Sequence, residues 1–210
     1  MKATNQTNAT PEPQEPYWVR RPGVTVSVCL GALVVLFSLY ILLAANYGNK
    51  HARIFRIGSE SMEPTVHEGE DVLVQLDAYA THSPQRGDLV TFLVPNGSAI
   101  SLKRVIAIGG DTISGTPDNT IVNGRELYEP YTFSARFGQG DKSSEGFPEE
   151  TFGPIRIPPN CFFVMGDNRE HSFDSRQPSF GCVPLDHVRG KAIQRGTWLQ
   201  VALYRGQRIQ

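Results

Sequence analysis

One apolar segment dominates the hydrophobic pattern of this chain. Pro22 to Asn49 contains no charged residue, and the 22 residues from Val24 to Ala45 are interrupted only by Thr25, Ser27, Gly31 and Ser38. As a helix rising about 1.5 Å per residue, this stretch extends over roughly 33 Å, close to the thickness of a bilayer hydrocarbon core. A cleaved secretory signal has a shorter apolar region of about 7–15 residues. The pattern therefore predicts a transmembrane anchor over residues 22–49, after a polar, disordered tail over residues 1–21.

Short β-rich runs follow the anchor and are separated by Gly, Pro, Asn and Asp clusters. Without a long helical period, this pattern is typical of an antiparallel β domain, here residues 50–210. The predicted strands are Asp71–Leu76, Asp88–Val94, Ile100–Ile108, Thr120–Val122, Cys161–Met165 and Trp198–Tyr204. Asn123-Gly124 predicts a hairpin turn. Between residues 129 and 159 the composition shifts to Gly, Ser, Glu and Pro, which predicts a surface excursion.

The charge balance excludes one class of partner and leaves the orientation of the anchor open. With 20 Lys and Arg against 21 Asp and Glu, the chain has no basic excess for binding a phosphate backbone, so we expect no nucleic-acid partner. Basic residues lie on both sides of the apolar segment, so the positive-inside rule does not decide which end is cytoplasmic.

Two serines, Ser59 and Ser61, alternate just before Pro64. A proline disfavours helical geometry at the preceding residue, so we expect Ser61 on an extended or sharply turned loop with its hydroxyl directed outward. Taken alone, a serine-rich turn is the simpler interpretation.

Two adjacent cations, Lys103 and Arg104, interrupt the apolar run Ile100–Ile108. Neighbouring side chains on a strand point to opposite faces, and we expect one of the two to be partly buried. Arginine keeps its proton at any working pH, whereas burial can lower the pKa of a lysine by several units. A neutral Lys103 could then take the proton of a serine hydroxyl. The alternative is a pair of surface cations on an edge strand.

Acidic residues and arginines alternate in the segment Gly166–Arg176, after the run Cys161–Met165. These charges can satisfy one another in a rigid loop, which can place a small hydroxyl against a neighbouring lysine. We therefore interpret them as structural.

In this order and behind one anchor, the three segments resemble those of bacterial type I signal peptidases, a family of Ser/Lys membrane endopeptidases. The boxes are S-x-S-M-x-P-T at Ser59–Thr65, R-G-D-[hydrophobic]-V-x-F at Arg86–Phe92, K-R-V at Lys103–Val105 and G-D-N-R-x-x-S-x-D-S-R at Gly166–Arg176. Four ordered boxes are far more specific than any one of them. The resemblance implies a mainly β fold, an antiparallel sheet with an SH3-like barrel, behind a single transmembrane helix.

The resemblance also implies a role for individual residues. Ser61 would be the nucleophile, Lys103 the general base, and the Ser59 hydroxyl would join the Ser61 backbone N–H in an oxyanion hole. Ser172 would orient the Lys103 amine. Ile57 and Met62 would line the substrate pocket, and Asp167, Arg169, Asp174 and Arg176 would brace the site.

By the same resemblance, the substrates are secreted pre-proteins cut after a small-x-small pattern such as Ala-x-Ala. The partners are then these signal-peptide-bearing pre-proteins, the lipid bilayer and, functionally, the secretion translocase. The catalytic domain would lie on the outer face of the plasma membrane, with residues 1–21 cytoplasmic. Two alternatives remain: a Ser/Lys peptidase with a narrow substrate, such as a conjugation pilin, or an inactive domain that binds pre-proteins.

The remaining cysteines and histidines add one open question. On the oxidising side of a membrane, Cys161 and Cys182 could form a disulfide worth roughly 3 kcal/mol, or they could stay two separate thiols. Cys29 lies in the apolar segment. The five histidines show no metal-ligand spacing with acids or cysteines, so we expect neither a metal ion nor a cofactor. His171, beside Ser172, is a minor candidate for the base.

Overall fold

The computed structural model describes residues 22–95, 97, 99–116, 119–137, 151–202 and 206–209. The predicted tail over residues 1–21 and the middle of the predicted excursion, residues 138–150, lie outside this part. The chain divides into two units, Met1–Tyr47 and Gly48–Gln210.

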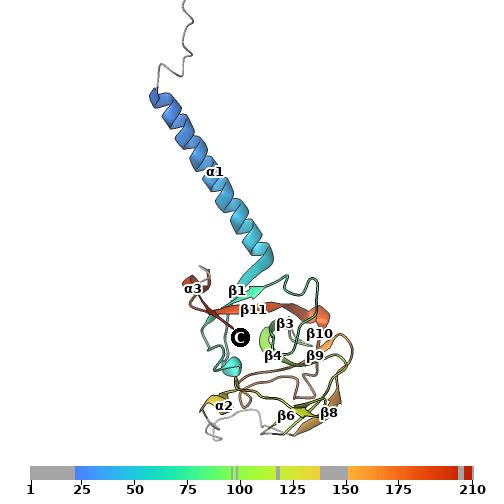
Figure 1. Cartoon of the computed structure of the whole chain (residues 1–210). Helices are drawn as coiled ribbons and strands as arrows, with labels where there is room; N and C mark the ends of the chain where they lie inside the picture. Colours follow the sequence, from blue (N-terminus) through green and yellow to red (C-terminus); the bar gives the residue numbers. More distant parts are fainter. Residues whose placement is uncertain are drawn as a thin grey trace, which may run out of the picture. The chain divides into compact units, whose positions relative to one another are not determined.

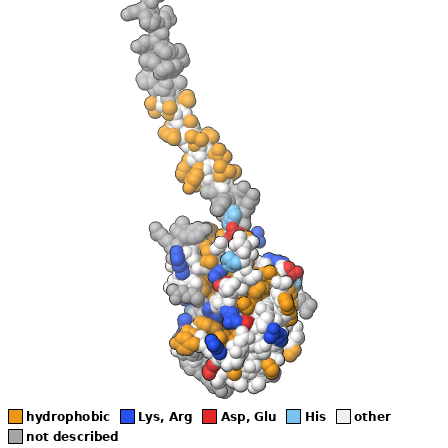
Figure 2. Space-filling view, turned by 45° about the vertical axis from the view of Figure 1, so that its right-hand side comes forward, with side chains coloured by type: hydrophobic (Ala, Val, Ile, Leu, Met, Phe, Trp, Pro, Cys, Tyr) orange, Lys and Arg blue, Asp and Glu red, His pale blue; other side chains and the backbone are white. Residues whose placement is uncertain are grey.

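Helix α1, Pro22–His51, contains the predicted anchor. Within it Val26–Leu43 has a mean hydropathy of 2.7 and is long and apolar enough to cross a membrane. None of this window is buried inside the protein, and Figure 2 shows its hydrophobic side chains uncovered along the helix. A helix that is apolar all round and is not covered by protein fits lipid surroundings.

The second unit is built on a large antiparallel sheet, shown in Figure 1. Its strand order is β1-β2-β11-β3-β4-β9-β10, with β12 paired to β11. The strands are β1 (Ala52–Arg56), β2 (Asp71–Gln75), β3 (Leu89–Leu93), β4 (Ile100–Ile108), β9 (Cys161–Met165), β10 (Val183–Pro184), β11 (Val188–Gly196) and β12 (Gln207–Arg208). The sheet is curled into a half-barrel with β1 and β10 at the two ends of this order, which confirms the predicted mainly β, antiparallel fold.

A second antiparallel sheet follows β4 in the chain, and Figure 1 shows it beside the main sheet at β6 and β8. Its order is β7-β6-β5-β8, from β5 (Thr112–Gly115), β6 (Thr120–Val122), β7 (Arg125–Glu126) and β8 (Phe152–Arg156). Asn123 and Gly124 both adopt positive φ between β6 and β7, which confirms the predicted hairpin turn.

The helices of the second unit are short. They are the 3-10 turns η1 (Glu60–Met62) and η2 (Leu185–His187) and the helices α2 (Phe133–Phe137) and α3 (Trp198–Ala202). The predicted strand Trp198–Tyr204 is therefore wrong. At the α3 N-terminus, the Gln200 side chain accepts hydrogen bonds from the Thr197 backbone N–H at 2.9 Å and from the Thr197 hydroxyl at 3.1 Å.

The predicted surface excursion over residues 129–159 needs correction at both ends. At the start, the Glu129 side chain is buried against Arg169. At the end, β8 pairs with β5, and Ile157 is only 1% exposed in the core. The residues of β8 are mostly exposed, which agrees with a surface segment. At Glu129 the polar composition misled the prediction, because this carboxylate finds its partner inside the protein.

Cys161 and Cys182 form a disulfide, so the first of the two open alternatives is correct. The bond ties β9 to the segment just before β10, and residues 166–176 lie between the two cysteines. Cys161 belongs to the apolar cluster that joins the two sheets through Ile106, Ile113 and Phe163. The disulfide therefore restrains the chain on both sides of the loop that carries half of the predicted site residues.

Candidate active site

The segment with the two serines forms a single tight turn. Ser59 precedes the 3-10 turn η1, and Glu63 returns to extended geometry before Pro64, as the sequence predicted. Ser61 lies within the turn and is only 6% exposed. The expectation of an outward hydroxyl is wrong, because the Ser61 side chain faces Lys103.

Lys103 lies on β4 between β3 and β9, so the alternative of surface cations on an edge strand is excluded. Its side chain is buried, with the residue 4% exposed. The Nζ atom lies 2.5 Å from Ser61 Oγ. The Oγ atom of Ser59 lies 3.2 Å from Ser61 Oγ. Two groups from distant segments, the Lys103 amine and the Ser59 hydroxyl, thus converge on the Ser61 hydroxyl.

The Lys103 amine is held in surroundings that favour its neutral form. Burial lowers the pKa of Lys103 to about 8, although the Asp174 and Asp167 carboxylates act in the opposite direction. Both carboxylates are already engaged by arginines: Asp174 by Arg176 and Asp167 by Arg104. Their charges are therefore largely balanced before they reach Lys103, and desolvation dominates.

The loop of residues 166–176 packs directly against the Ser61 turn. The Asn168 backbone N–H donates to the Ser61 carbonyl at 3.1 Å, and the Asn168 side chain donates to the Glu60 carbonyl at 3.3 Å. Gly166 has no room for a side chain, since a Cβ there would lie 2.4 Å from the Ser61 carbonyl oxygen and 2.3 Å from Ser172 Oγ. Close packing of backbone on backbone explains the glycine.

Ser172 lies at this contact and is only 1% exposed. Among the described residues, its hydroxyl makes no hydrogen bond of normal geometry, either to Lys103 or to another group. The expected role in orienting the Lys103 amine stays a prediction. A buried hydroxyl without a partner is costly, so this one stands out in the site.

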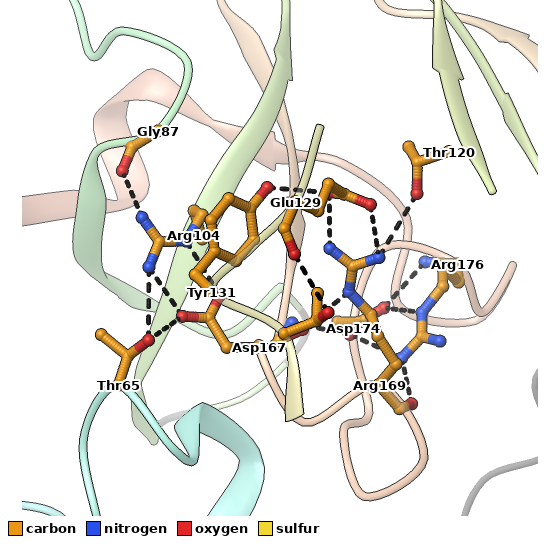
Figure 3. A network of polar contacts seen from close by, with 12 residues as sticks. Thr65, Gly87, Arg104, Thr120, Glu129, Tyr131, Asp167, Arg169, Asp174 and Arg176 are labelled. Atoms are coloured by element: carbon orange, nitrogen blue, oxygen red, sulfur yellow. Dashed lines mark hydrogen bonds and ion pairs between the residues drawn. The ribbon is translucent and has the colours of Figure 1, made fainter. Parts of the chain in front are cut away.

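The arginines and carboxylates of the loop are paired, but not only with one another (Figure 3). Asp174 accepts hydrogen bonds from Arg176 at 2.9 and 3.0 Å, as expected within the loop. Asp167 instead accepts a bidentate pair from Arg104 of β4, at 2.8 and 2.7 Å. The expectation that the loop charges satisfy one another is therefore only partly correct.

Arg169 pairs with Glu129, which lies after β7 of the second sheet, at 2.6 and 3.0 Å. The Tyr131 hydroxyl donates to the same Glu129 carboxylate at 2.8 Å, and its ring lies 3.9 Å from the Arg104 guanidinium carbon. The sequence analysis missed Glu129 and Tyr131 as parts of the site, and treated Arg104 only as a neighbour of Lys103. No spacing in the sequence reveals contacts between segments so far apart.

The two expected pocket residues lie at different depths. Met62 is 1% exposed and packs in the apolar cluster that includes Val66, Leu89 and Leu102, so it faces the core in this structure. Ile57 is half-buried at the edge of the same cluster.

His171 Nδ1 lies 3.4 Å from Glu60 Oε1. In the described part of the chain, no three His, Cys, Asp or Glu side chains are grouped as metal ligands would be.

Comparison with known families fits this geometry. A model of the family "Signal peptidase, peptidase S26" matches residues 30–197. The chain belongs to this family. Together with the apolar helix α1, membership indicates a membrane-anchored protein.

Individual relatives carry the same name. Signal peptidase I of Mycobacterium tuberculosis is 35% identical over 67% of this chain, and the chain spans only 63% of that protein's length. Signal peptidase I of Bacillus licheniformis is 30% identical over 90% of this chain and 89% of the relative. A crystal structure of a signal peptidase I from Enterococcus faecalis is 32% identical, with a TM-score of 0.43, over 51% of this chain and 95% of that one.

Proposed function

We propose that this chain is a membrane-anchored endopeptidase that removes signal peptides from secreted pre-proteins by a Ser61/Lys103 dyad. The observation that carries the proposal is the buried Lys103 amine 2.5 Å from the Ser61 hydroxyl. Burial lowers the pKa of this amine to about 8, so a useful fraction is neutral near physiological pH. Membership of the signal peptidase family supports the choice of substrate.

The reaction follows from the proton that the two groups share. Neutral Lys103 takes the proton of Ser61 Oγ as this oxygen attacks the carbonyl carbon of the scissile bond. The resulting ammonium returns the proton to the leaving amine, and an acyl-enzyme on Ser61 remains. Lys103 then deprotonates the water that hydrolyses this ester, and Ser61 recovers its proton.

The tetrahedral intermediate requires donors that are in place before the reaction. The Ser61 backbone N–H and the Ser59 hydroxyl form this oxyanion hole in the proposal, and the 3.2 Å contact between the two hydroxyls supports it. Ser172 orients the Lys103 amine when substrate is bound. The ion pairs of Asp167, Arg169, Asp174 and Arg176 brace these groups and do not react.

The proposal also includes the substrate and the side of the membrane on which the domain acts. Cleavage follows a small-x-small pattern such as Ala-x-Ala in this proposal. A shallow substrate site at half-buried Ile57, with Met62 packed behind it in the core, would reject larger side chains by overpacking. The domain acts on the outer face of the plasma membrane, with the N-terminus cytoplasmic, on pre-proteins that the translocase delivers. An anchor in the same bilayer as the signal peptide raises the local concentration of both partners.

The test is cleavage of a pre-protein with an Ala-x-Ala site by the detergent-solubilised chain, with sequencing of the new N-terminus. We expect wild type to cut after the second alanine, and Ser61→Ala and Lys103→Ala to lose at least about a hundredfold in rate while remaining folded. His171→Ala is the matched control and should keep its activity, because the His171 ring lies 3.4 Å from the exposed Glu60 carboxylate and Lys103 serves as the base in this proposal.

Other outcomes of this experiment would support a different base or a different function. Full activity of Lys103→Ala would place the base elsewhere. A wild type that ignores general pre-proteins but cuts one precursor would indicate the narrow processing role, and a wild type that cuts none would favour a binding domain.

A further inference from the structure

Glu129 is a buried carboxylate outside the sequence boxes of the site. It follows β7, and its side chain is 11% exposed. Although burial raises the pKa of Glu129, the hydrogen bonds and charge of Arg169 hold it below its usual range, so the group is ionised. Both oxygens accept from Arg169, and one also accepts from the Tyr131 hydroxyl.

Arg169 connects the Glu129 carboxylate to the backbone of Gly166. Its Nε donates to the Gly166 carbonyl at 3.0 Å, while its two terminal nitrogens are held by Glu129 and, at 3.3 Å, by Thr120 of β6. Figure 3 shows Arg169 lying between the loop on one side and Glu129 and Thr120 on the other. Glu129 accepts from both terminal nitrogens, so it is the main group that holds the guanidinium with Nε directed at Gly166.

The backbone of Gly166 is fastened at both of its polar groups. Its N–H donates to Asp174 Oδ2 at 2.9 Å, and Asp174 is itself paired with Arg176. Its carbonyl is held by Arg169, as above. Gly166 in turn presses against the Ser61 carbonyl, where even a methyl group would not fit. Displacement of Gly166 would thus move the Ser61 turn relative to Lys103.

We propose that Glu129 is a positioning residue for catalysis: through Arg169 it holds Gly166 against the Ser61 turn, so that the second sheet fixes the nucleophile. This inference rests on the Ser61/Lys103 reaction proposed above. Glu129 touches neither Ser61 nor Lys103, so it is not itself a catalytic residue.

The chain offers a close control in Asp88. Its carboxylate is also 11% exposed, and it also accepts from a tyrosine, Tyr79, at 3.0 Å and from a cation, Lys191, at 2.5 Å. All three partners of its side chain, Tyr79, Lys191 and the Gln85 backbone N–H, lie outside the 166–176 loop. Asp88→Asn thus removes a comparable buried charge without touching the fastening of Gly166.

The experiment compares Glu129→Gln with Asp88→Asn in the full chain, in detergent, at a temperature where both are folded. Hydrogen exchange is followed at the amides of residues 166–176, and kcat and KM are measured on the Ala-x-Ala pre-protein. In Glu129→Gln we expect these amides to exchange about tenfold faster and kcat to fall about tenfold, with KM within about twofold. Asp88→Asn should change neither, even where both variants lose the same thermal stability.

Several results would overturn the inference. They are unchanged exchange in the loop of Glu129→Gln, faster exchange with an unchanged kcat, a loss that lies in KM, or an equal loss of kcat in Asp88→Asn. If Glu129→Gln does not fold, Tyr131→Phe removes only the hydroxyl that donates to Glu129, and it should show the same pattern at about threefold.

The exchange measurement requires no turnover, so it separates this inference from the proposed function. If wild type leaves the pre-protein intact, the proposed function fails. The exchange data alone then decide whether Glu129 fixes the loop, and equal exchange in the two variants would still overturn it.

Discussion

Lys103 and Arg104 are neighbours on β4, and both are almost fully buried, yet the protein treats their charges in opposite ways. Arg104 meets the Asp167 carboxylate with two hydrogen bonds, donates to the Gly87 carbonyl at 3.0 Å and lies over the Tyr131 ring. Lys103 meets the hydroxyl of Ser61 and has no carboxylate within salt-bridge distance in the described part of the chain.

The difference shows how one strand can hold both a fixed charge and an amine that can lose its proton. A buried charge must be paired or must lose its proton. Arg104 is paired and keeps its charge, and Lys103 is not, so burial lowers its pKa to about 8. Arginine could not fill the second role, because its pKa is too high for deprotonation in a protein.

Replacing Lys103 by arginine, so that both neighbours keep their charge, should have the largest effect on the cleavage rate. Lys103→Arg keeps a positive charge beside Ser61 but removes the group that can become neutral, so we expect the cleavage rate to fall by about 10²- to 10⁴-fold. The rate is measured on the Ala-x-Ala pre-protein from pH 7 to 10. Recovery of the variant at high pH, or activity within a few-fold of wild type, would show that proton transfer to residue 103 is not required.

Removing the partner of Arg104 tests whether this buried charge depends on its ion pair. Asp167→Asn keeps the shape of the side chain but leaves the Arg104 charge uncompensated in a site where it is 2% exposed. Breaking a buried ion pair in this way should lower the free energy of unfolding by about 3–5 kcal/mol. Urea unfolding of wild type and variant measures the change.

A double-mutant cycle checks that the loss belongs to the pair. Arg104→Gln together with Asp167→Asn should lower the free energy of unfolding by less than the sum of the two single changes. Each single variant leaves one buried charge without its partner, whereas the double variant removes both charges. Strict additivity of the two losses would mean that Arg104 and Asp167 are not coupled.

The strands that sequence alone predicted are those with large apolar side chains at alternate or successive positions. Strands β2, β3, β4, β6 and β9 were predicted within one or two residues at each end. β11 was missed, although it is as long as β4 and lies between β2 and β3. Its buried positions are Gly190, Ala192 and Gln194, so the alternation is present but carries no apolar signal. Gly190 is small because a Cβ there would lie 2.4 Å from the Gln75 carbonyl oxygen.

The residues of the site also fall into those that the sequence predicts and those that it does not. The residues that meet at Ser61 could be named because ordered boxes in the sequence resemble a known family. The pairing of Asp167 with Arg104 and of Arg169 with Glu129 could not, since these contacts depend on how β4, the 166–176 loop and the second sheet pack in three dimensions. The segment after β7 looks like a polar loop in sequence, and only its buried partners show that it belongs to the site.

The smallest expected effect concerns stability, and it distinguishes a lysine with a lowered pKa from one with an ordinary pKa. Between about pH 8 and pH 10.5 the unfolded chain binds a proton at residue 103 that the folded chain has released, so the stability of wild type should rise with pH over this interval. Lys103→Met removes the buried amine, and below pH 8 it should be more stable than wild type by about 3 kcal/mol. This advantage should shrink steadily as the pH approaches 10.5. Lys191→Met is the control, because Lys191 is 38% exposed and paired with Asp88, so its loss should stabilise the protein at no pH. An advantage of Lys103→Met that stays constant from pH 7 to 10.5 would contradict a lowered pKa for Lys103, and with it the assignment of this residue as the base.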